Sequence, residues 1–278
     1  MSDFDGDTLR SFGCPDCGGA IAMEVGRSEP TCLFCGRASL VEQPLPEGVE
    51  APRAWMPFDV QREGAQEAFE TFAASSIWYP GDLGRSTLEL RPLFLPAWIW
   101  AGTVETHWAA LVRGSTLSGK QPDSGSAIRR LEGVLVAASP TLTAAELAAI
   151  APFEAQGERP FDPHAMPAPF ELGELTRAVA RRVAFDRMAA AEHQRLEGEV
   201  GAVRLRTSRL VREDVGRSVL LPVWIGAYRR GDRLHRVVVN GQTGRLTGSA
   251  PISVQRVLVA VVVVLFLVAL IAFMAGNL

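Results

Sequence analysis

Leu95-Pro96-Ala97-Trp98-Ile99-Trp100-Ala101 decides how the central part of the chain is interpreted, because it recurs without a gap as Leu221-Pro222-Val223-Trp224-Ile225-Gly226-Ala227. Each copy follows an amphipathic helical pattern and an alternating strand, and each leads into another strand. We therefore predict an α+β fold with two related units, each a helix plus an antiparallel hairpin, packed side by side. Chance similarity of seven residues is the alternative.

The residue types inside the repeat indicate its place in a sheet. Proline has no backbone N–H to donate, so Pro96 and Pro222 predict a strand start, an edge or a bulge. Trp98 and Trp100 alternate along the strand, which is typical of a sheet face packed against a helix. A small-ligand pocket lined by these Trp- and Tyr-rich strands is the weaker alternative.

The first unit is predicted to span residues 57–169. Its helix runs from Val60 to about residue 75, with Asp59 as the N-cap. Thr143-Ala144-Ala145-Glu146 is a capping box that opens a short helix. Residues 114–126 are polar and predict a loop or hairpin tip. Alternating patterns predict strands over residues 86–91, 93–102, 104–112 and 130–138.

The second unit is predicted to span residues 170–253, beginning with a long helix over residues 171–199. Leu172 and Leu175 open the apolar stripe of this helix. Asn240-Gly241 indicates a tight turn before a short last strand. The other strands are predicted over residues 201–212, 218–228 and 233–239.

Two CxxC motifs near the N-terminus predict a metal module over residues 10–42. Gly18 and Gly36 directly follow the second cysteine of each motif, where the turn requires a positive φ. The residues between the motifs alternate and predict a short hairpin with strands over 20–25 and 31–34. The four predicted ligands are Cys14, Cys17, Cys32 and Cys35.

This ligand set favours one tetrahedral Zn²⁺, with an iron centre or a redox dithiol pair as alternatives. Four protein thiolates leave no open position, so the ion is predicted to be structural and to supply the folding free energy that so small a module lacks. The Pro-rich, acidic segment 43–56 follows as a semi-rigid linker.

Charge is unevenly distributed along the chain. Residues 1–56 carry nine acids against four arginines, whereas residues 177–236 carry fourteen arginines against seven acids. The acidic ribbon argues against nucleic-acid binding by the metal module. The Arg-rich region predicts contact with lipid head groups or with a polyanion, through Arg229, Arg230, Arg233 and Arg236.

The stretch Val257–Ala275 contains no charged side chain and predicts a transmembrane helix of about 28 Å. A buried core helix or strand pair is the alternative. Arg245 and Arg256 precede the stretch, so we expect a single-pass inner-membrane protein with a cytoplasmic body. The acidic residues 1–7 do not resemble a secretory signal.

The cysteine motifs, Leu95-Pro96-Ala97-Trp98, Leu221-Pro222-Val223-Trp224 and Val239-Asn240-Gly241-Gln242-Thr243-Gly244 together resemble a bacterial family with a TFIIB-type zinc ribbon. Members of this family are often labelled replication-restart helicase-like, but the chain has no GxxxxGK[ST] motif. Some members carry transmembrane segments and are encoded beside flotillin-like (SPFH) or phage-shock proteins. For this chain, the resemblance implies a membrane adaptor or recruitment role.

We expect a non-enzymatic, tail-anchored adaptor whose partners are cytoplasmic or membrane-associated proteins. His107, His164, His193 and His235 are scattered, and we interpret His107 and His235 as strand-surface residues. No GxSxG motif or Gly-rich phosphate loop is present. A membrane-tethered nucleic-acid-binding protein that uses residues 177–236 is the alternative.

Overall fold

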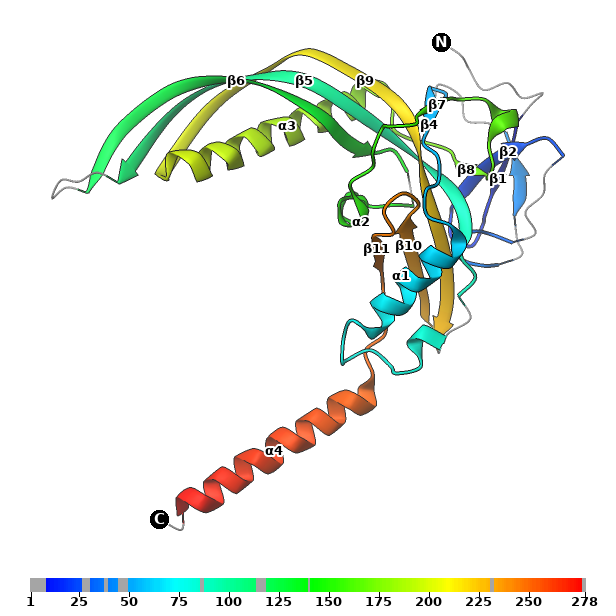
Figure 1. The fold of residues 1–278 in the computed structure, drawn as a ribbon, viewed down its shortest axis with the longest axis vertical. Coiled ribbons are helices and arrows are strands. Elements are labelled where there is room, and N and C mark those ends of the chain that lie inside the picture. The colour runs from blue at the N-terminus through cyan, green and yellow to red at the C-terminus, as the bar shows by residue number, and fades with distance from the viewer. Residues whose placement is uncertain are drawn as a thin grey trace.

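The computed structural model describes residues 9–26, 31–37, 40–44, 50–85, 88–113, 119–139, 141–230 and 233–276, without the side chains of residues 85, 229, 269, 270 and 272–276. These residues form an α+β fold with an 11-stranded sheet and four α-helices (Figure 1). The helices are α1 (Arg62–Ala74), α2 (Ala144–Ile150), α3 (Arg177–Val200) and α4 (Val254–Gly276), and two 3-10 turns cover Leu83–Arg85 and Pro163–Ala165. The strands are β1 (Leu9–Gly13), β2 (Ala20–Glu24), β3 (Val41–Gln43), β4 (Ala54–Trp55), β5 (Arg91–Arg113), β6 (Lys120–Ala137), β7 (Arg159–Pro160), β8 (Phe170–Glu171), β9 (Ala202–Arg230), β10 (Arg233–Asn240) and β11 (Leu246–Gly248).

Two long antiparallel strands, β5 and β9, form the centre of the sheet. The strand order is β11-β10-β9-β5-β8-β2-β1-β3, and β6 also pairs with β5. Beyond the core, β6, β5 and β9 continue together as a curved arm with α3 along its concave side (Figure 1). At the other end of the molecule, α4 projects from the body (Figure 1).

The two copies of the repeated stretch lie directly against each other. Leu95 pairs with Leu221, which is its equivalent in the other copy, and the pairing continues in antiparallel register on both sides. A local two-fold axis therefore passes through this residue pair. The ranges 57–169 and 170–253 consequently contribute to one sheet and share one core.

The two helices are exchanged between the two halves. The indole N–H of Trp98 donates to the carbonyl of Leu175 at 3.2 Å, and that of Trp224 donates to the carbonyl of Val60 at 2.9 Å. Each acceptor lies two residues before a helix, Leu175 before α3 and Val60 before α1. Each Trp is thus covered by the helix of the other half, which corrects the expectation that each helix packs on its own hairpin.

The helices bury equivalent stripes, because residues four apart lie on one face of a helix. The buried residues are Ala65, Phe69 and Ala73 in α1, and Ala180, Ala184, Met188, Glu192 and Leu196 in α3. The prediction that Trp98 and Trp100 form a sheet face packed against a helix is confirmed, because both lie in the cluster that α3 covers. Trp98 borders a cavity of about 20 Å³, which is too small for a ligand larger than water.

The polar stretch 114–126 differs from its prediction. Residues 114–118 lie outside the described residues, but residues 120–126 belong to β6 and not to a loop. Each of them pairs with a residue of β5, from Lys120 opposite Arg113 to Ser126 opposite His107. These cross-strand hydrogen bonds override the local preference of Gly, Ser and Pro for turns.

Helix starts also differ from their predictions. The second helix begins at Arg177 and not at residue 171, because Phe170 and Glu171 form β8, which pairs with both β2 and β5. Leu172 therefore packs in a loop. The N-cap of α1 is Gln61 and not Asp59, whose amide instead donates to the carbonyl of Gly241. The predicted capping box at Thr143 and Glu146 is confirmed.

The strands predicted over residues 201–212 and 218–228 are one continuous strand, β9. Glu213 has a positive φ of 51°, at the point where pairing to β5 shifts by one residue. Such a bulge lets the strand bend without ending. The last short strand after Asn240-Gly241 is confirmed as β11.

The C-terminal stretch is helical. It forms α4, whose apolar side chains are exposed along the described part. The range 257–275 predicted to cross a membrane includes side chains outside the described ones. Among the residues that the structure describes, no helix combines the length and apolarity needed to span a bilayer.

Candidate metal centre and buried polar network

The two CxxC motifs fold into two matching turns. The amide of Gly18 donates to the carbonyl of Cys14, and the amide of Gly36 donates to the carbonyl of Cys32, both at 2.9 Å. The predicted positive φ at each glycine is confirmed, at 75° for Gly18 and 73° for Gly36. A side chain at either position would strain the turn, so these glycines allow each pair of thiols to point at one centre.

The four cysteines converge as predicted. The Sγ atoms of Cys14 and Cys35 are 3.7 Å apart, and those of Cys17 and Cys32 are 3.6 Å apart. All four Sγ atoms lie within 4.8 Å of one another. A tetrahedral site with metal–sulfur bonds of about 2.3 Å requires sulfur–sulfur distances of about 3.8 Å. The arrangement therefore fits one tetrahedral metal ion.

The environment of the thiols favours a cation at this point. Burial raises the pKa of the Cys32 thiol, and burial also raises the pKa of Cys17. Without a cation, this burial keeps the Cys17 and Cys32 thiols protonated at neutral pH. A divalent ion stabilises the negatively charged thiolates, so metal binding displaces the thiol protons.

The metal centre is packed onto the body of the protein. β2 pairs with β8 and so joins β1, β2 and β3 to the main sheet. Cys14, Cys32 and Cys35 lie in the same hydrophobic cluster as Leu93 and Leu95. Of the predicted hairpin, residues 20–24 form a strand, but Thr31–Cys35 form the second metal turn, because Cys32 must close on Gly36.

The four arginines predicted to contact lipid head groups or a polyanion do not form one surface. Arg236 points inward, where it donates to the carbonyl of Thr141 at 2.7 Å and to Glu146 at 2.6 Å. Arg230 lies on the surface and pairs with Asp82 at 3.1 Å. Arg233 is exposed, and the Arg229 side chain lies outside the described ones.

The histidines occupy separate environments. His164 pairs with Glu24, His193 lies against Thr207 on the arm, and His107 is exposed beside Glu105. The interpretation of His235 as a surface residue is wrong: only 8% of it is exposed, and its ring stacks on Tyr228.

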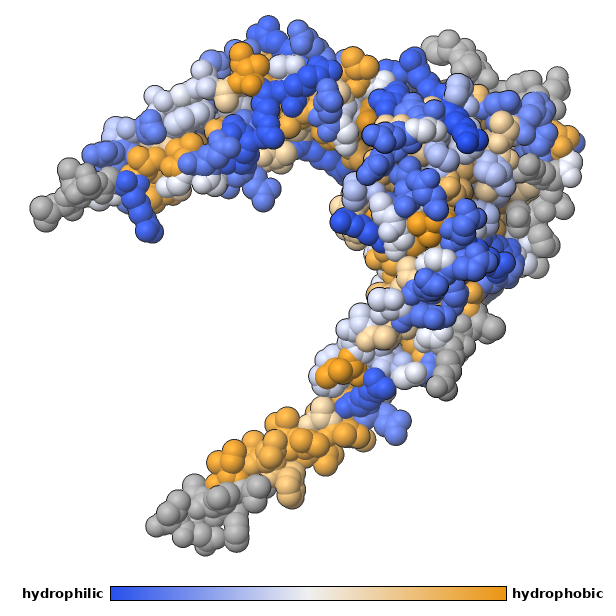
Figure 2. Space-filling model, viewed as in Figure 1, coloured by the Kyte–Doolittle hydropathy of each residue, from blue (hydrophilic) through white to orange (hydrophobic). Residues whose placement is uncertain are grey.

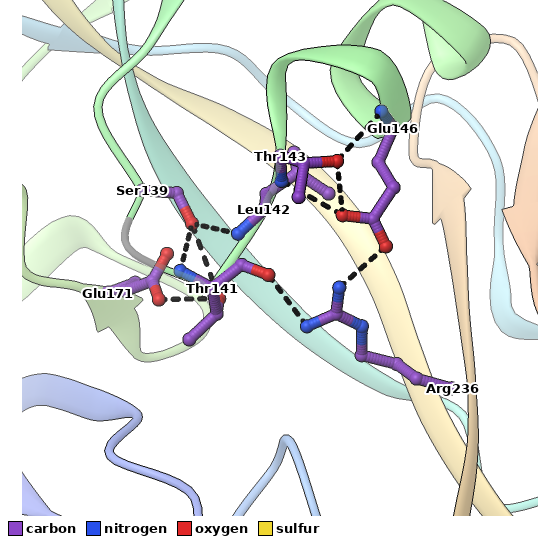
Figure 3. Close-up of polar contacts among 7 residues, drawn as sticks. All are labelled: Ser139, Thr141, Leu142, Thr143, Glu146, Glu171 and Arg236. Carbon is purple, nitrogen blue, oxygen red and sulfur yellow. Dashed lines mark hydrogen bonds and ion pairs between the residues drawn. The ribbon is translucent and has the colours of Figure 1, made fainter.

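A buried polar network joins three segments that are distant in the sequence (Figure 3). Thr141, in the loop after β6, donates its hydroxyl to Glu171 of β8 at 2.6 Å. Ser139 accepts from the amide of Thr141 at 3.2 Å. Arg236 of β10 connects the same loop to Glu146 of α2. The network therefore fixes the position of α2 on the sheet.

Glu171 is the unusual member of this network. It is fully buried, and burial raises its pKa to about 7 although hydrogen bonds from Ser139 and Thr141 oppose the shift. Its Oε2 has no hydrogen-bond partner among the described residues, and Glu171 lines the cavity of about 20 Å³ beside Trp98. One water fits such a space.

Sequence reasoning missed this network for two reasons. It placed Glu171 in a helix, and it counted Arg236 among surface cations. The available signal was the acid itself, since Phe170-Glu171-Leu172 is a lone carboxylate within an apolar run. A charged residue in such a run is rarely buried without a partner.

Comparisons with known proteins found no matching family model, no matching curated protein and no matching solved structure. The resemblance to the bacterial zinc-ribbon family therefore stays a prediction from the motifs.

Proposed function

We propose that the protein is a non-enzymatic adaptor that α4 anchors in the bacterial inner membrane, with the ribbon and the sheet presented to protein partners. The exposure of α4 is the observation that carries this proposal. Leu258, Leu265 and Phe266 expose 62–66% of their surface on a helix that leaves the body (Figures 1 and 2). An apolar helix left in water is unfavourable, whereas in lipid the same surface is solvated.

The metal module supports the adaptor role. We propose that Cys14, Cys17, Cys32 and Cys35 hold one Zn²⁺, because four thiolates in a tetrahedron are typical of structural zinc. Such an ion has no open coordination position for a substrate. Its role is to hold the ribbon in shape at one end of the sheet.

Orientation and partners follow from the sequence. Arg245 precedes α4 and Arg256 lies in its first turn, on the body side, which favours a cytoplasmic body. The partners we propose are cytoplasmic or membrane-associated proteins, and the resemblance implies the flotillin-like (SPFH) or phage-shock classes. The proposed role is then to recruit these partners to the membrane.

The anchor is tested by membrane fractionation with alkaline carbonate extraction of the full-length chain. We expect the protein to stay with the membrane, and we expect the double variant Val262→Lys/Leu265→Lys to be extracted, because charges at the centre of a span are costly. Ile252→Lys is the matched control, since it charges an exposed apolar residue that precedes α4. A wild-type chain that is itself extracted would contradict the proposal.

Partner binding is tested by crosslinking in cells followed by purification in mild detergent. We expect protein partners whose recovery falls with Cys32→Ser and with Val262→Lys/Leu265→Lys. Thr31→Ser is the control for the ribbon, because it changes a neighbour of Cys32 without removing a thiol. Recovery that neither variant changes would remove the adaptor role.

A specific patch favours nucleic-acid binding as the second candidate. Arg113, Lys120, Arg204 and Arg206 lie at the tip of the arm, and none has an ion-pair partner among the described residues. Leu111 pairs with Arg204, and Arg113 pairs with Lys120, so strand alternation places all four cations on one face. A salt titration of DNA binding tests this candidate: a steep log–log slope supports it, and no binding at low salt removes it.

A further inference from the structure

An open pocket lies where α4 leaves the body. Its volume is about 780 Å³, and it lies between the segment after α1 and the first turns of α4. Residues on its wall include Trp78, Asp82, Arg230, Arg256 and Val259. The pocket is therefore at the level where a membrane surface would lie if α4 is inserted, as proposed above.

Arg256 provides the main positive charge of this pocket. Its Nη1 donates to the carbonyls of Ile77 at 2.8 Å and Tyr79 at 2.7 Å, and no carboxylate among the described residues pairs with it. A Cβ at Gly81 would lie 2.8 Å from Nη2, so the guanidinium packs closely against this glycine. The remaining N–H groups of the guanidinium are free to bind an anion.

Arg230 and Asp82 occupy the same wall. Their ion pair, at 3.1 Å, has side-chain exposures of 39% and 65%. Exposed pairs of this kind are weak, so an incoming phosphate can compete for Arg230. With Arg256 included, the three side chains carry a net positive charge.

Part of the pocket wall is apolar. Val259 and Ala260 belong to the first turns of α4, and their surface continues along the exposed helix. Trp78 exposes 40% of its surface at the rim. Trp and Arg beside an apolar helix are the residues that concentrate at the interface between lipid and water.

We infer that this pocket binds the head group of an anionic phospholipid. The phosphate lies against Arg256 and Arg230, and an acyl chain runs along α4 past Val259. A cationic wall that continues into an apolar helix matches an amphiphile, whereas free phosphate would leave the apolar wall unused. The inference rests on the proposed membrane anchoring of α4.

The test uses the full-length chain in neutral-detergent micelles, with phosphatidylglycerol or phosphatidylcholine added and lipid retention measured by native mass spectrometry. We expect retention of phosphatidylglycerol over phosphatidylcholine, and we expect Arg256→Gln to lower phosphatidylglycerol affinity about fivefold, from the loss of one interfacial cation. Arg233→Gln is the matched control, because it removes an exposed arginine outside the pocket.

A second variant controls for local disruption of the first turn of α4. Asp82→Asn removes the carboxylate that competes with phosphate, so we expect it to raise affinity for phosphatidylglycerol. Equal retention of the two lipids by the wild type would overturn the inference, as would unchanged affinity in both variants. Full displacement of the lipid by millimolar inorganic phosphate would also overturn it, in favour of a free-phosphate site.

Carbonate extraction separates this inference from the proposed function. Arg256→Gln should stay in the membrane, because α4 remains apolar. A wild-type chain that does not insert removes the anchoring proposal, whereas a chain that inserts but shows no lipid preference removes only the head-group site.

Discussion

The two halves of the sheet share one plan and differ at two positions of the repeat, by a small change at Ala97/Val223 and by a large one at Trp100/Gly226. Trp98 and Trp224 are equivalent: each is buried and each donates its indole N–H to the chain just before a helix. After each hairpin, an amide bonds to the proline carbonyl of the repeat, at 3.0 Å for Pro96 and 2.9 Å for Pro222. The Pro and Trp that the two copies share therefore make equivalent contacts in both halves.

The large difference between the two copies is Trp100 in the first against Gly226 in the second. Trp100 is buried against Gly216, where a Cβ would lie 2.4 Å from the ring. At Gly226 a Cβ would lie 2.7 Å from Leu88, so this glycine lets the chain before β5 approach the sheet. The first hairpin continues as the arm under α3, and the second is shorter and is covered by α1. The half that carries Trp100 is thus the extended one, and the half that carries Gly226 is the closed one.

Removing the large side chain of the extended half should have the largest effect. We expect Trp100→Ala to lower the free energy of unfolding by about 3–5 kcal/mol, because it opens a cavity under α3. Trp78→Ala is the control, since Trp78 is 40% exposed. Chemical denaturation in detergent measures both changes. Equal costs for the two variants would mean that Trp100 does not anchor the arm.

Glu171, in β8, makes stability depend on pH. The pKa of Glu171 is raised to about 7 from 4.5, so the folded state holds this proton more tightly than the unfolded state. The contribution of Glu171 to stability is therefore greatest at low pH and falls as the pH rises from about 4.5 to about 7. We expect Glu171→Gln to remove this decline and to be more stable at pH 8 by about 3 kcal/mol.

The control for that prediction is Glu174→Gln, which changes a nearby exposed acid. Denaturation midpoints between pH 4.5 and 8 provide the measurement. A wild-type midpoint that declines no more across this range than the midpoint of Glu171→Gln would contradict the proton assignment at Glu171.

The equivalence of the two Trp residues is open to a direct comparison. We expect Trp98→Phe and Trp224→Phe each to cost about 2 kcal/mol, because each leaves a carbonyl without its indole donor and removes part of a buried ring. Thermal or chemical unfolding of the two variants would check this. A large cost at one position and none at the other would break the pseudo-two-fold relation.

The smallest expected effect concerns α2, which follows the hairpin of the first half. Thr143→Ala should cost about 1 kcal/mol, because it removes the oxygen that caps the helix through the amide of Glu146. Thr71→Ala, on the exposed face of α1, is the control. Hydrogen exchange localised to α2 would show whether the loss stays local; equal exchange in both variants would contradict the capping role.

Local patterns carried much of the prediction. The metal ligands, the positive φ at Gly18 and Gly36 and the capping box at Thr143 and Glu146 follow from residues close in sequence. Strand pairing decided the elements that these local patterns predict incorrectly. Lys120–Ser126 look like a loop by composition, and Glu171 looks helical by periodicity, but partners in β5 and β2 make both of them strands.

The sequence by itself determined the metal centre and the repeat, because both depend on spacing within a few residues of chain. Only the tertiary structure decided that Leu95 meets Leu221, that each helix covers the Trp of the other half and that Arg236 turns inward to Glu146. These contacts join residues about a hundred positions apart. They are selected by the packing of the whole sheet, and no local pattern encodes them.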